Sequence, residues 1–223
     1  MPANRQVGGP DVPARAPEPV FAPIPAPPAG LNGVDSSLLS ASGLGMIRGE
    51  RVLFTGIGLS LVRGSSVVLR GSNGAGKTTL LRILAGLTRP EAGDISRNGA
   101  HHWFAHREGL KPHETPRMHL GLWAKAWGSD ADIDAVLARM GLKRPADVPA
   151  RYLSAGQRRR TALGRLLLEQ RPIWLLDEPY TALDAEGREL VLELIEAHLA
   201  SGGGVVAAIH GESGFTPGSE VVL

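Results

Sequence analysis

The 223-residue chain contains no cysteine. This absence excludes disulfide bonds, thiolate zinc sites, iron–sulfur clusters and a cysteine nucleophile. The chain also lacks any apolar run approaching 18 residues, and its N-terminus lacks the basic, then apolar, order of a signal peptide. We therefore expect any membrane role to depend on a partner.

Excess charge of one sign is absent as well. The 24 Lys and Arg residues are nearly matched by 22 Asp and Glu, so the formal net charge is +2. This balance argues against a strongly cationic mode of nucleic-acid binding, and we expect no nucleic-acid partner. Lysine is scarce among the cations, which are mostly arginine, so the isolated Lys77 calls for a specific reason.

Composition divides the chain into two parts. Nine of the 17 prolines fall between Pro2 and Pro28, interleaved with alanine. Proline lacks an amide donor and has a fixed φ, so residues 1–35 cannot form a helix or a buried strand. We predict a disordered or polyproline-like tail there, with a docking segment for another protein as the alternative. Residues 36–223 are expected to form one domain.

Within that domain, apolar and β-branched runs alternate with helical periodicity. Strands are predicted at 51–54, 57–62, 66–70, 173–176 and 205–209, and helices at 78–85, 132–140, 157–170 and 185–200. This alternation predicts an α/β fold with a parallel sheet. The stretch from about 105 to 151 has helical pieces without clear strands, so we predict a helical insertion, its subdomain covering about 105–170.

A phosphate-binding loop lies between a predicted strand and helix. Residues 71–78 read Gly-Ser-Asn-Gly-Ala-Gly-Lys-Thr, which fits G-x-x-x-x-G-K-[ST]. Glycines let backbone amides approach phosphate oxygens, Lys77 brings a full charge, and the Thr78 hydroxyl is suited to Mg²⁺. The predicted nucleotide-binding residues here are Gly71, Ser72, Asn73, Gly74, Ala75, Gly76, Lys77, Thr78 and Thr79.

Two carboxylates end the apolar run 173–176. Asp177 at the end of such a strand can lie beside a metal ion, and Glu178 can act as general base on a water molecule. Taken alone, the run also fits a strand edge with solvated acids. The phosphate loop upstream favours the catalytic interpretation.

A third motif, Leu-Ser-Ala-Gly-Gln at 153–157, is followed by Arg158, Arg159 and Arg160. Ser and Gly at a helix start can present amides and a hydroxyl to an anion. Three arginines also allow a nucleic-acid interpretation. Because no aromatic residues interleave with them, we interpret them as a solvated helix face.

The order of these motifs resembles the ATP-binding cassette (ABC) ATPases over about residues 38–210. The phosphate loop is followed by Leu-Ser-Ala-Gly-Gln, Leu-Leu-Asp-Glu-Pro, Thr-Ala-Leu-Asp at 181–184, and His210. The resemblance implies a P-loop NTPase fold with a RecA-like, mostly parallel core sheet, an antiparallel β subdomain and a helical insertion. It also implies ATP hydrolysis with ATP and Mg²⁺ as ligands.

The resemblance assigns roles to individual positions. It implies catalytic roles for Lys77, Glu178 and His210, and metal binding by Thr78 and Asp177. Ser154, Gly156 and Gln157 would contact the γ-phosphate of ATP held by a second copy, with Asp184 at the dimer interface. The implied assembly is a head-to-tail homodimer enclosing two ATP molecules. Independently, the helix after Ser154 lies beyond the insertion, which places it out of reach of its own phosphate loop.

A narrower resemblance rests on residues 106–112, 154–168 and 177–184. These stretches are similar to the ATP-binding subunits of bacterial cytochrome c maturation systems, the heme exporter protein A family. That likeness implies integral membrane permease partners, haem export or haem-chaperone release, and a peripheral location on the cytoplasmic face of the inner membrane. It implies no direct haem binding.

Several positions depart from the ABC pattern. Arg107 stands where a glutamine is usual, and arginine cannot ligate a metal. An aromatic residue usually stacks on the adenine, whereas Arg48 occupies that position by spacing. Ser72 replaces the usual proline and Ala155 the usual glycine, both mild changes.

Other functions remain open from the sequence. The chain could serve another ABC exporter, or act as a soluble ABC ATPase on ribosomes or DNA, although its single cassette argues against the latter. A nucleotide-binding scaffold with little turnover is a third possibility, which the presence of Glu178 and His210 weakens. A metal site at His101, His102 and His106 is disfavoured, because three histidines near a probable strand, without a carboxylate partner, seldom bind a metal.

Overall fold

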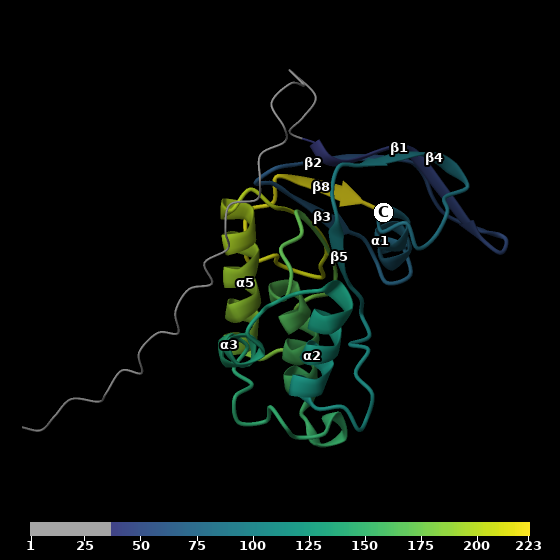
Figure 1. The fold of residues 1–223 in the computed structure, drawn as a ribbon. Helices are drawn as coiled ribbons and strands as arrows, with labels where there is room; N and C mark the ends of the chain where they lie inside the picture. The colour runs from purple at the N-terminus through teal and green to yellow at the C-terminus, as the bar shows by residue number, and fades with distance from the viewer. Residues whose placement is uncertain (1–36) are drawn as a thin grey trace, which may run out of the picture.

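The computed structural model of the protein describes residues 37–223 (Figure 1). The tail predicted for residues 1–35 lies outside them. The described chain contains two sheets and a lobe of helices, which hangs below the sheets in the view of Figure 1.

The central sheet is parallel and five-stranded, which confirms the predicted α/β class. Its strands, in the spatial order β5-β6-β7-β3-β8, are β5 (His101–Phe104), β6 (Ile173–Asp177), β7 (Gly204–Ala208), β3 (Ser66–Arg70) and β8 (Ser219–Val222). The three middle strands are apolar and buried on both faces, as parallel strands under two layers must be. The edge strands β5 and β8 have only four residues each, and neither was predicted.

Alternate residues of the middle strands face two separate cores. Val67 and Leu69 of β3 pack with α1 (Lys77–Leu84) and the second sheet, whereas Val68 packs with α5 (Ala185–Ala200) and the helical lobe. The period of two along a strand sends successive side chains to opposite faces. One core attaches α5 and the helical lobe to one face of the sheet, and the other core attaches α1 and the second sheet to the opposite face.

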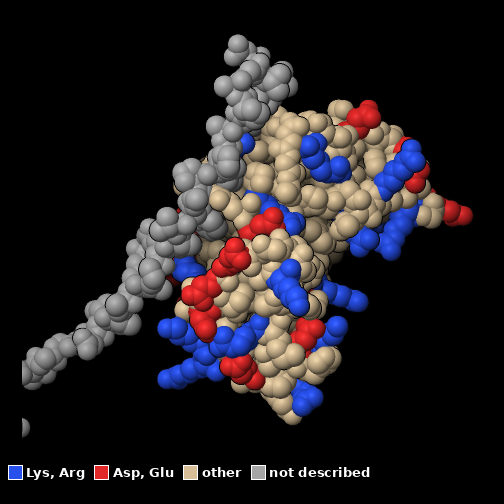
Figure 2. Space-filling model, viewed as in Figure 1, with Lys and Arg blue, Asp and Glu red and all other residues tan. Residues whose placement is uncertain are grey.

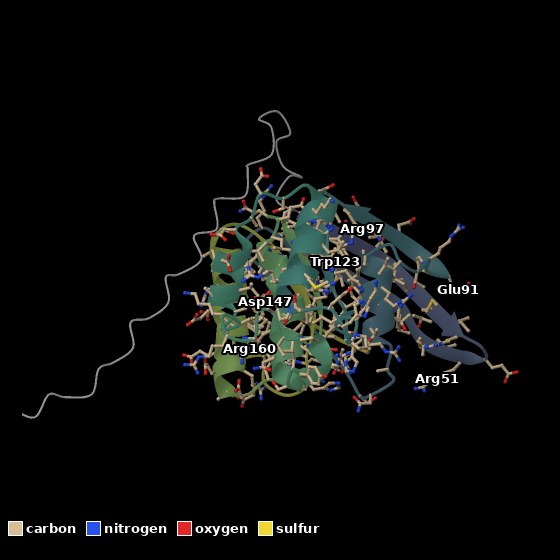
Figure 3. The ribbon with its side chains drawn as sticks, turned by 60° about the horizontal axis from the view of Figure 1, so that its bottom comes forward. Arg51, Glu91, Arg97, Trp123, Asp147 and Arg160 are labelled. Carbon is tan, nitrogen blue, oxygen red and sulfur yellow. The ribbon has the colours of Figure 1, made fainter. Side chains whose placement is uncertain are left out.

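The second sheet is antiparallel, with the order β2-β1-β4. It consists of β1 (Ser37–Arg48), β2 (Arg51–Val62) and β4 (Ala92–Arg97), and Figure 3 shows Arg51 and Glu91 toward its outer end. Residues 51–54 and 57–62 belong to one strand rather than the predicted two. Gly56, at φ +68°, lies where the pairing register shifts, so the glycine marks a bulge rather than a break. Strands β1 and β4 were not predicted.

The helical lobe lies between β5 and β6. It contains α2 (Pro116–Trp127), α3 (Ile133–Arg139), the short 3₁₀ helix η1 (Ala150–Tyr152), α4 (Ala155–Leu163) and the 3₁₀ helix η2 (Gly164–Leu167). The helix predicted at 157–170 therefore ends early. A Cβ at Gly164 would lie 3.1 Å from a methyl of Leu120, so the chain passes close to α2 where the α-helix gives way to η2.

The described surface carries mixed charge. Figure 2 shows acidic side chains interspersed with basic ones on the face viewed, most densely over the helical lobe. Among residues 37–223, no helix combines the length and apolarity needed to cross a membrane.

A buried histidine makes the stability of this fold depend on pH. The His198 ring stacks on Trp174 at 4.0 Å between centroids, and burial lowers the pKa of His198 to about 4. The unfolded chain takes up this proton near pH 6.5 and the folded protein near pH 4, so stability present above pH 6.5 is lost as the pH falls toward 4.

We expect His198→Phe, which keeps a ring against Trp174 but cannot be protonated, to lose less stability on acidification. The difference between wild type and variant should change by on the order of 3 kcal/mol between pH 7 and pH 4. Urea unfolding at several pH values measures this difference. Parallel pH profiles for the two proteins would contradict the assignment.

Candidate functional site

The phosphate-binding loop joins β3 to α1, as predicted. Gly71 and Gly76 adopt φ +138° and +110°, which disfavour side chains. A Cβ at Gly71 would lie 2.7 Å from the Leu223 carbonyl, and one at Gly76 would lie 3.0 Å from the Phe54 ring. These glycines are therefore required by backbone conformation and packing, in addition to any approach of phosphate. The Phe54 side chain packs against Gly76 and in the hydrophobic core.

Lys77 is the first residue of α1, and its side chain folds back over the loop. Its Nζ donates hydrogen bonds to the carbonyls of Gly71 at 2.7 Å and Ser72 at 3.0 Å. An ammonium group has three donors, so one is available for a phosphate oxygen while the other two stabilise the loop. This geometry supplies a reason for the isolated lysine in an arginine-rich chain.

A cleft of about 190 Å³ opens beside the loop. It brings together most of the residues predicted to bind nucleotide and all three of the predicted catalytic residues. Its lining consists of Arg48, Leu53, Asn73, Gly74, Gly76, Lys77, Thr78, Thr79, Glu178 and His210. Arg48, chosen from its spacing to the loop, therefore lies at the cleft. Gly71, Ser72 and Ala75 belong to the loop but lie outside this lining.

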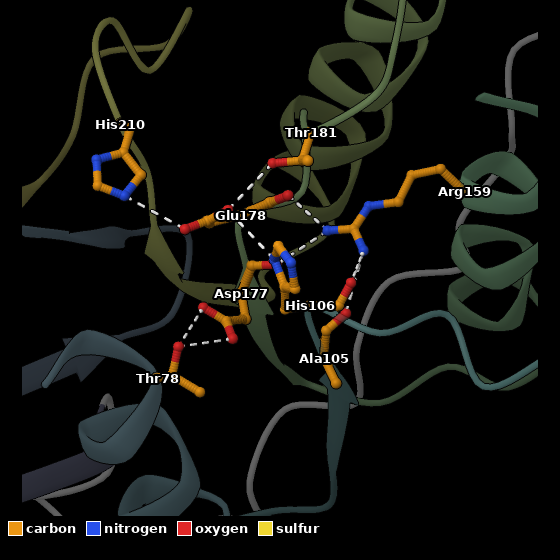
Figure 4. Close-up of polar contacts among 8 residues, drawn as sticks. All are labelled: Thr78, Ala105, His106, Arg159, Asp177, Glu178, Thr181 and His210. Carbon is orange, nitrogen blue, oxygen red and sulfur yellow. Dashed lines mark hydrogen bonds and ion pairs between the residues drawn. The ribbon is translucent and has the colours of Figure 1, made fainter. Parts of the chain in front are cut away.

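Asp177 ends β6 beside the start of α1. The Thr78 hydroxyl donates to its carboxylate, with distances of 2.9 and 3.1 Å to the two oxygens (Figure 4). Burial raises the pKa of Asp177, the neighbouring charge of Glu178 adds to this effect, and the Thr78 hydrogen bond opposes it. A carboxylate and a hydroxyl are the oxygen ligands that Mg²⁺ prefers, and a cation here would relieve the cost of burying Asp177.

Glu178 follows immediately and has an unusual backbone. Its φ is +50°, a region that non-glycine residues adopt rarely and mostly at constrained sites. One carboxylate oxygen lies 3.2 Å from Nε2 of His210, and the other lies 3.3 Å from Nδ1 of His106 (Figure 4). Because Glu178 and His210 both line the cleft, this carboxylate can accept a proton from a water molecule bound there.

The loop carrying His210 is anchored by the side chain of Arg70. Arg70, at the end of β3, donates to the carbonyl of Gly211 and forms an ion pair with Glu220 of β8 at 2.9 Å. These contacts tie the segment after β7 to the neighbouring strand β3 and, through Arg70, to β8. They hold His210 at the same edge as the phosphate loop.

Arg159 corrects the expectation that the three arginines form a solvated helix face. Its side chain is 1% exposed and lies 4.2 Å over the Phe104 ring. The guanidinium donates to four backbone carbonyls, at distances from 2.5 to 3.2 Å: those of Ala105, His106, Asp177 and Glu178 (Figure 4). Burial lowers the pKa of Arg159. Nothing in the sequence distinguishes this arginine from Arg158 and Arg160.

The predicted anion-binding motif at 154–157 forms the N-terminus of α4, away from the cleft. The Ser154 hydroxyl accepts from the Gln157 amide at 3.1 Å, and the Gln157 side chain accepts from the Ser154 amide at 2.9 Å. A Cβ at Gly156 would lie 3.2 Å from the Ala182 carbonyl, so the motif packs against the segment that precedes α5. None of Ser154, Gly156 or Gln157 lines the cleft beside the phosphate loop of the same chain.

The histidines considered as a metal site do not form one. His102 is buried in β5, bonded to the Glu169 carbonyl at 2.8 Å, and burial lowers its pKa to about 3. Within residues 37–223 no three His, Cys, Asp or Glu side chains form a group that could hold a metal ion. Arg107 is exposed on the segment between β5 and α2.

Comparison with known proteins agrees with this geometry. The ABC transporter family model matches residues 54–181, more than half of the chain. A solved "ATP binding subunit of ABC transporter" superposes with a TM-score of 0.69 and 26% identity, covering 78% of this chain and 79% of that one. A putative ABC transporter ATP-binding protein from Pyrococcus furiosus shows the same fold, with a TM-score of 0.71 at 20% identity over 83% and 96% of the two chains. The fold and the cleft define an ABC-type ATPase.

Individual relatives identify a narrower family within the ABC-type ATPases. A protein from Hyphomonas neptunium, named "Cytochrome c biogenesis ATP-binding export protein CcmA", is 66% identical over 83% of this chain and 96% of its own length. A protein of the same name from Methylococcus capsulatus is 48% identical over 77% and 90%. The chain belongs to this family of cytochrome c biogenesis ATP-binding export proteins within the ABC transporters.

The buried guanidinium of Arg159 should be a strong determinant of stability. Arg159→Met fills a similar volume but leaves the four carbonyls without their donor. We expect a loss of about 2–4 kcal/mol in the free energy of unfolding. Arg158→Met is the matched control, because Arg158 is half-buried and donates to the Leu153 carbonyl. Urea unfolding should show less than half the loss for the control, and equal losses would contradict the special role of Arg159.

Proposed function

We propose that this chain is the ATP-hydrolysing subunit of a membrane complex for cytochrome c biogenesis, where hydrolysis drives haem export or release of a haem chaperone. The observation that carries the proposal is 66% identity over 96% of a relative with that biogenesis name. The cleft, which brings Lys77, Glu178 and His210 together, supports it. The same relatives favour a transport complex over the ribosome- or DNA-acting alternatives. The chain would act peripherally on the cytoplasmic face of the inner membrane, through permease partners.

Each group at the cleft has a defined task in this proposal. The phosphate loop and Lys77 bind the phosphates of ATP, and Arg48 stacks on the adenine through its planar guanidinium. Thr78 and Asp177 would hold Mg²⁺, which would neutralise charge on the phosphate oxygens. Glu178 takes the proton of the attacking water, and His210 contacts the γ-phosphate.

A head-to-tail homodimer completes the site. Ser154, Gly156 and Gln157 lie outside the lining of the cleft of their own chain, although an anion-binding helix start is what a γ-phosphate requires. A second copy can bring this motif to the cleft. Asp184, the N-cap of α5, follows the segment that packs against Gly156, so it would lie at the same interface.

Glu178→Gln should separate binding from chemistry. The amide can still orient water but cannot take up its proton, so ATP binding should persist and turnover should fall at least 100-fold. The bound ATP should also trap the dimer, as seen by gel filtration. Lys77→Ala should instead lose nucleotide binding, because it removes the ammonium group from the loop. Undiminished phosphate release by Glu178→Gln would overturn its role as general base.

The same variant tests the biological role in the native host. Deleting the gene for this chain should remove covalently haem-bound c-type cytochromes, detected by haem staining of denaturing gels. Wild type should restore them, whereas an equal amount of Glu178→Gln should not. Normal c-type cytochromes in the deletion strain would reject the proposed pathway without affecting the ATPase assignment.

Arg107 should set how far hydrolysis depends on the membrane partner. It is exposed, offers only hydrogen-bond donors and follows His106 on the segment that joins the sheet to the helical lobe. We expect low ATPase activity in the isolated subunit, and Arg107→Gln should raise partner-free hydrolysis or Mg²⁺ affinity while weakening coupling in the complex. Phosphate release at varied Mg²⁺, with and without the membrane subunits, measures both effects. If Arg107→Gln and Arg107→Ala both match wild type, Arg107 is an ordinary surface arginine.

A further inference from the structure

The carboxylate of Glu178 is held from two sides by histidines on different loops. His210, after β7, lies 3.2 Å from Oε1, and His106, after β5, lies 3.3 Å from Oε2 (Figure 4). The Thr181 hydroxyl also donates to Oε2 at 3.2 Å. A carboxylate oxygen accepts hydrogen bonds, so His106 can hold Oε2 only through a hydrogen on its Nδ1.

The buried side chain of Arg159 supports both His106 and Glu178. Arg159 donates to the backbone carbonyl of His106 at 2.7 Å and to that of Glu178 at 2.5 Å. One guanidinium therefore holds the main chain at both residues, from which the two side chains extend toward each other (Figure 4). The His106 side chain is 59% exposed, so water screens this contact and its effect on stability is small. The main effect of the contact is therefore to orient the carboxylate of Glu178.

We propose that His106 is a positioning residue for the general base. This inference rests on the proposed function, in which Glu178 accepts the proton of water. His106 and Thr181 hold Oε2, which leaves Oε1 directed toward His210 and the cleft. When His210 turns to the γ-phosphate, Oε1 becomes free to accept from water while His106 still prevents rotation of the carboxylate. Glu178 and His210 line the cleft, but His106 does not, so its effect on chemistry is indirect.

The position of His106 also connects the base to the rest of the complex. It directly precedes Arg107 on the segment between the sheet and the helical lobe. A movement of this segment changes the orientation of the carboxylate without contacting the nucleotide. Control of hydrolysis by a partner bound to the helical lobe can thus act through His106 on the base itself.

The test compares three variants of the full chain in single-turnover phosphate release. His106→Ala removes the donor, and His106→Asn retains an N–H donor close to the Nδ1 position. His113→Ala is the matched control, an exposed histidine further along the same segment. We expect His106→Ala to lower the rate about tenfold, a part of the 10²–10⁴-fold effect of a general base. Its ATP affinity and melting temperature should stay at wild-type values, His106→Asn should recover most of the rate, and His113→Ala should match wild type.

A double-mutant cycle tests whether the effect of His106→Ala on the rate acts through Glu178. In the Glu178→Gln background, His106→Ala should cause no further loss, because the group that it positions is already inactive. A wild-type rate for His106→Ala beside an inactive Glu178→Gln would overturn the positioning role and leave the proposed function intact. Equal losses for His106→Ala and His106→Asn, or a lowered melting temperature in both, would also overturn it. An active Glu178→Gln would instead reject the general base, and with it the proposed function.

Discussion

The site depends on one buried guanidinium. Arg159 extends from α4 and bonds to carbonyls at the ends of β5 and β6, which are separate in sequence but adjacent in the sheet. A buried arginine without partners would cost several kcal/mol, so its four hydrogen bonds are a condition of the fold. Because α4 begins with the Ser154 motif, this side chain also links the anion-binding helix start to the two carboxylates.

The arrangement of the remaining groups follows from parallel strands. β3, β6 and β7 all end at the same edge, so the phosphate loop, the two carboxylates and His210 converge there. Neighbouring β5 brings His106 to that edge as well. Between these strands the chain makes long excursions, including the whole helical lobe. The excursions can vary in shape while the sheet edge keeps the reacting groups in place.

Backbone strain is concentrated at this edge. Glu178 and Ala182 are the non-glycine residues with positive φ in the described chain, and they bracket the segment that joins the base to α5. Such conformations cost on the order of 1–3 kcal/mol each and persist only where surrounding contacts enforce them. Here the Arg159 bond to the Glu178 carbonyl and the close approach of Gly156 to the Ala182 carbonyl provide that enforcement. The strained segment lies between the site of hydrolysis and the surface proposed to meet a second copy.

The sequence by itself determined the phosphate loop, the strand ending in Asp177 and Glu178, the α/β class and the family, because each depends on short-range patterns of residue type and spacing. It also identified Arg48 at the cleft from spacing alone. It missed β1, β4, β5 and β8, which are short or contain glycines and exposed polar residues that weaken the strand signal, and it divided β2 at a bulge. The tertiary structure alone decided which arginine of 158–160 is buried and that His106 contacts the base. Both facts depend on contacts between residues tens of positions apart, and local sequence carries no record of such contacts.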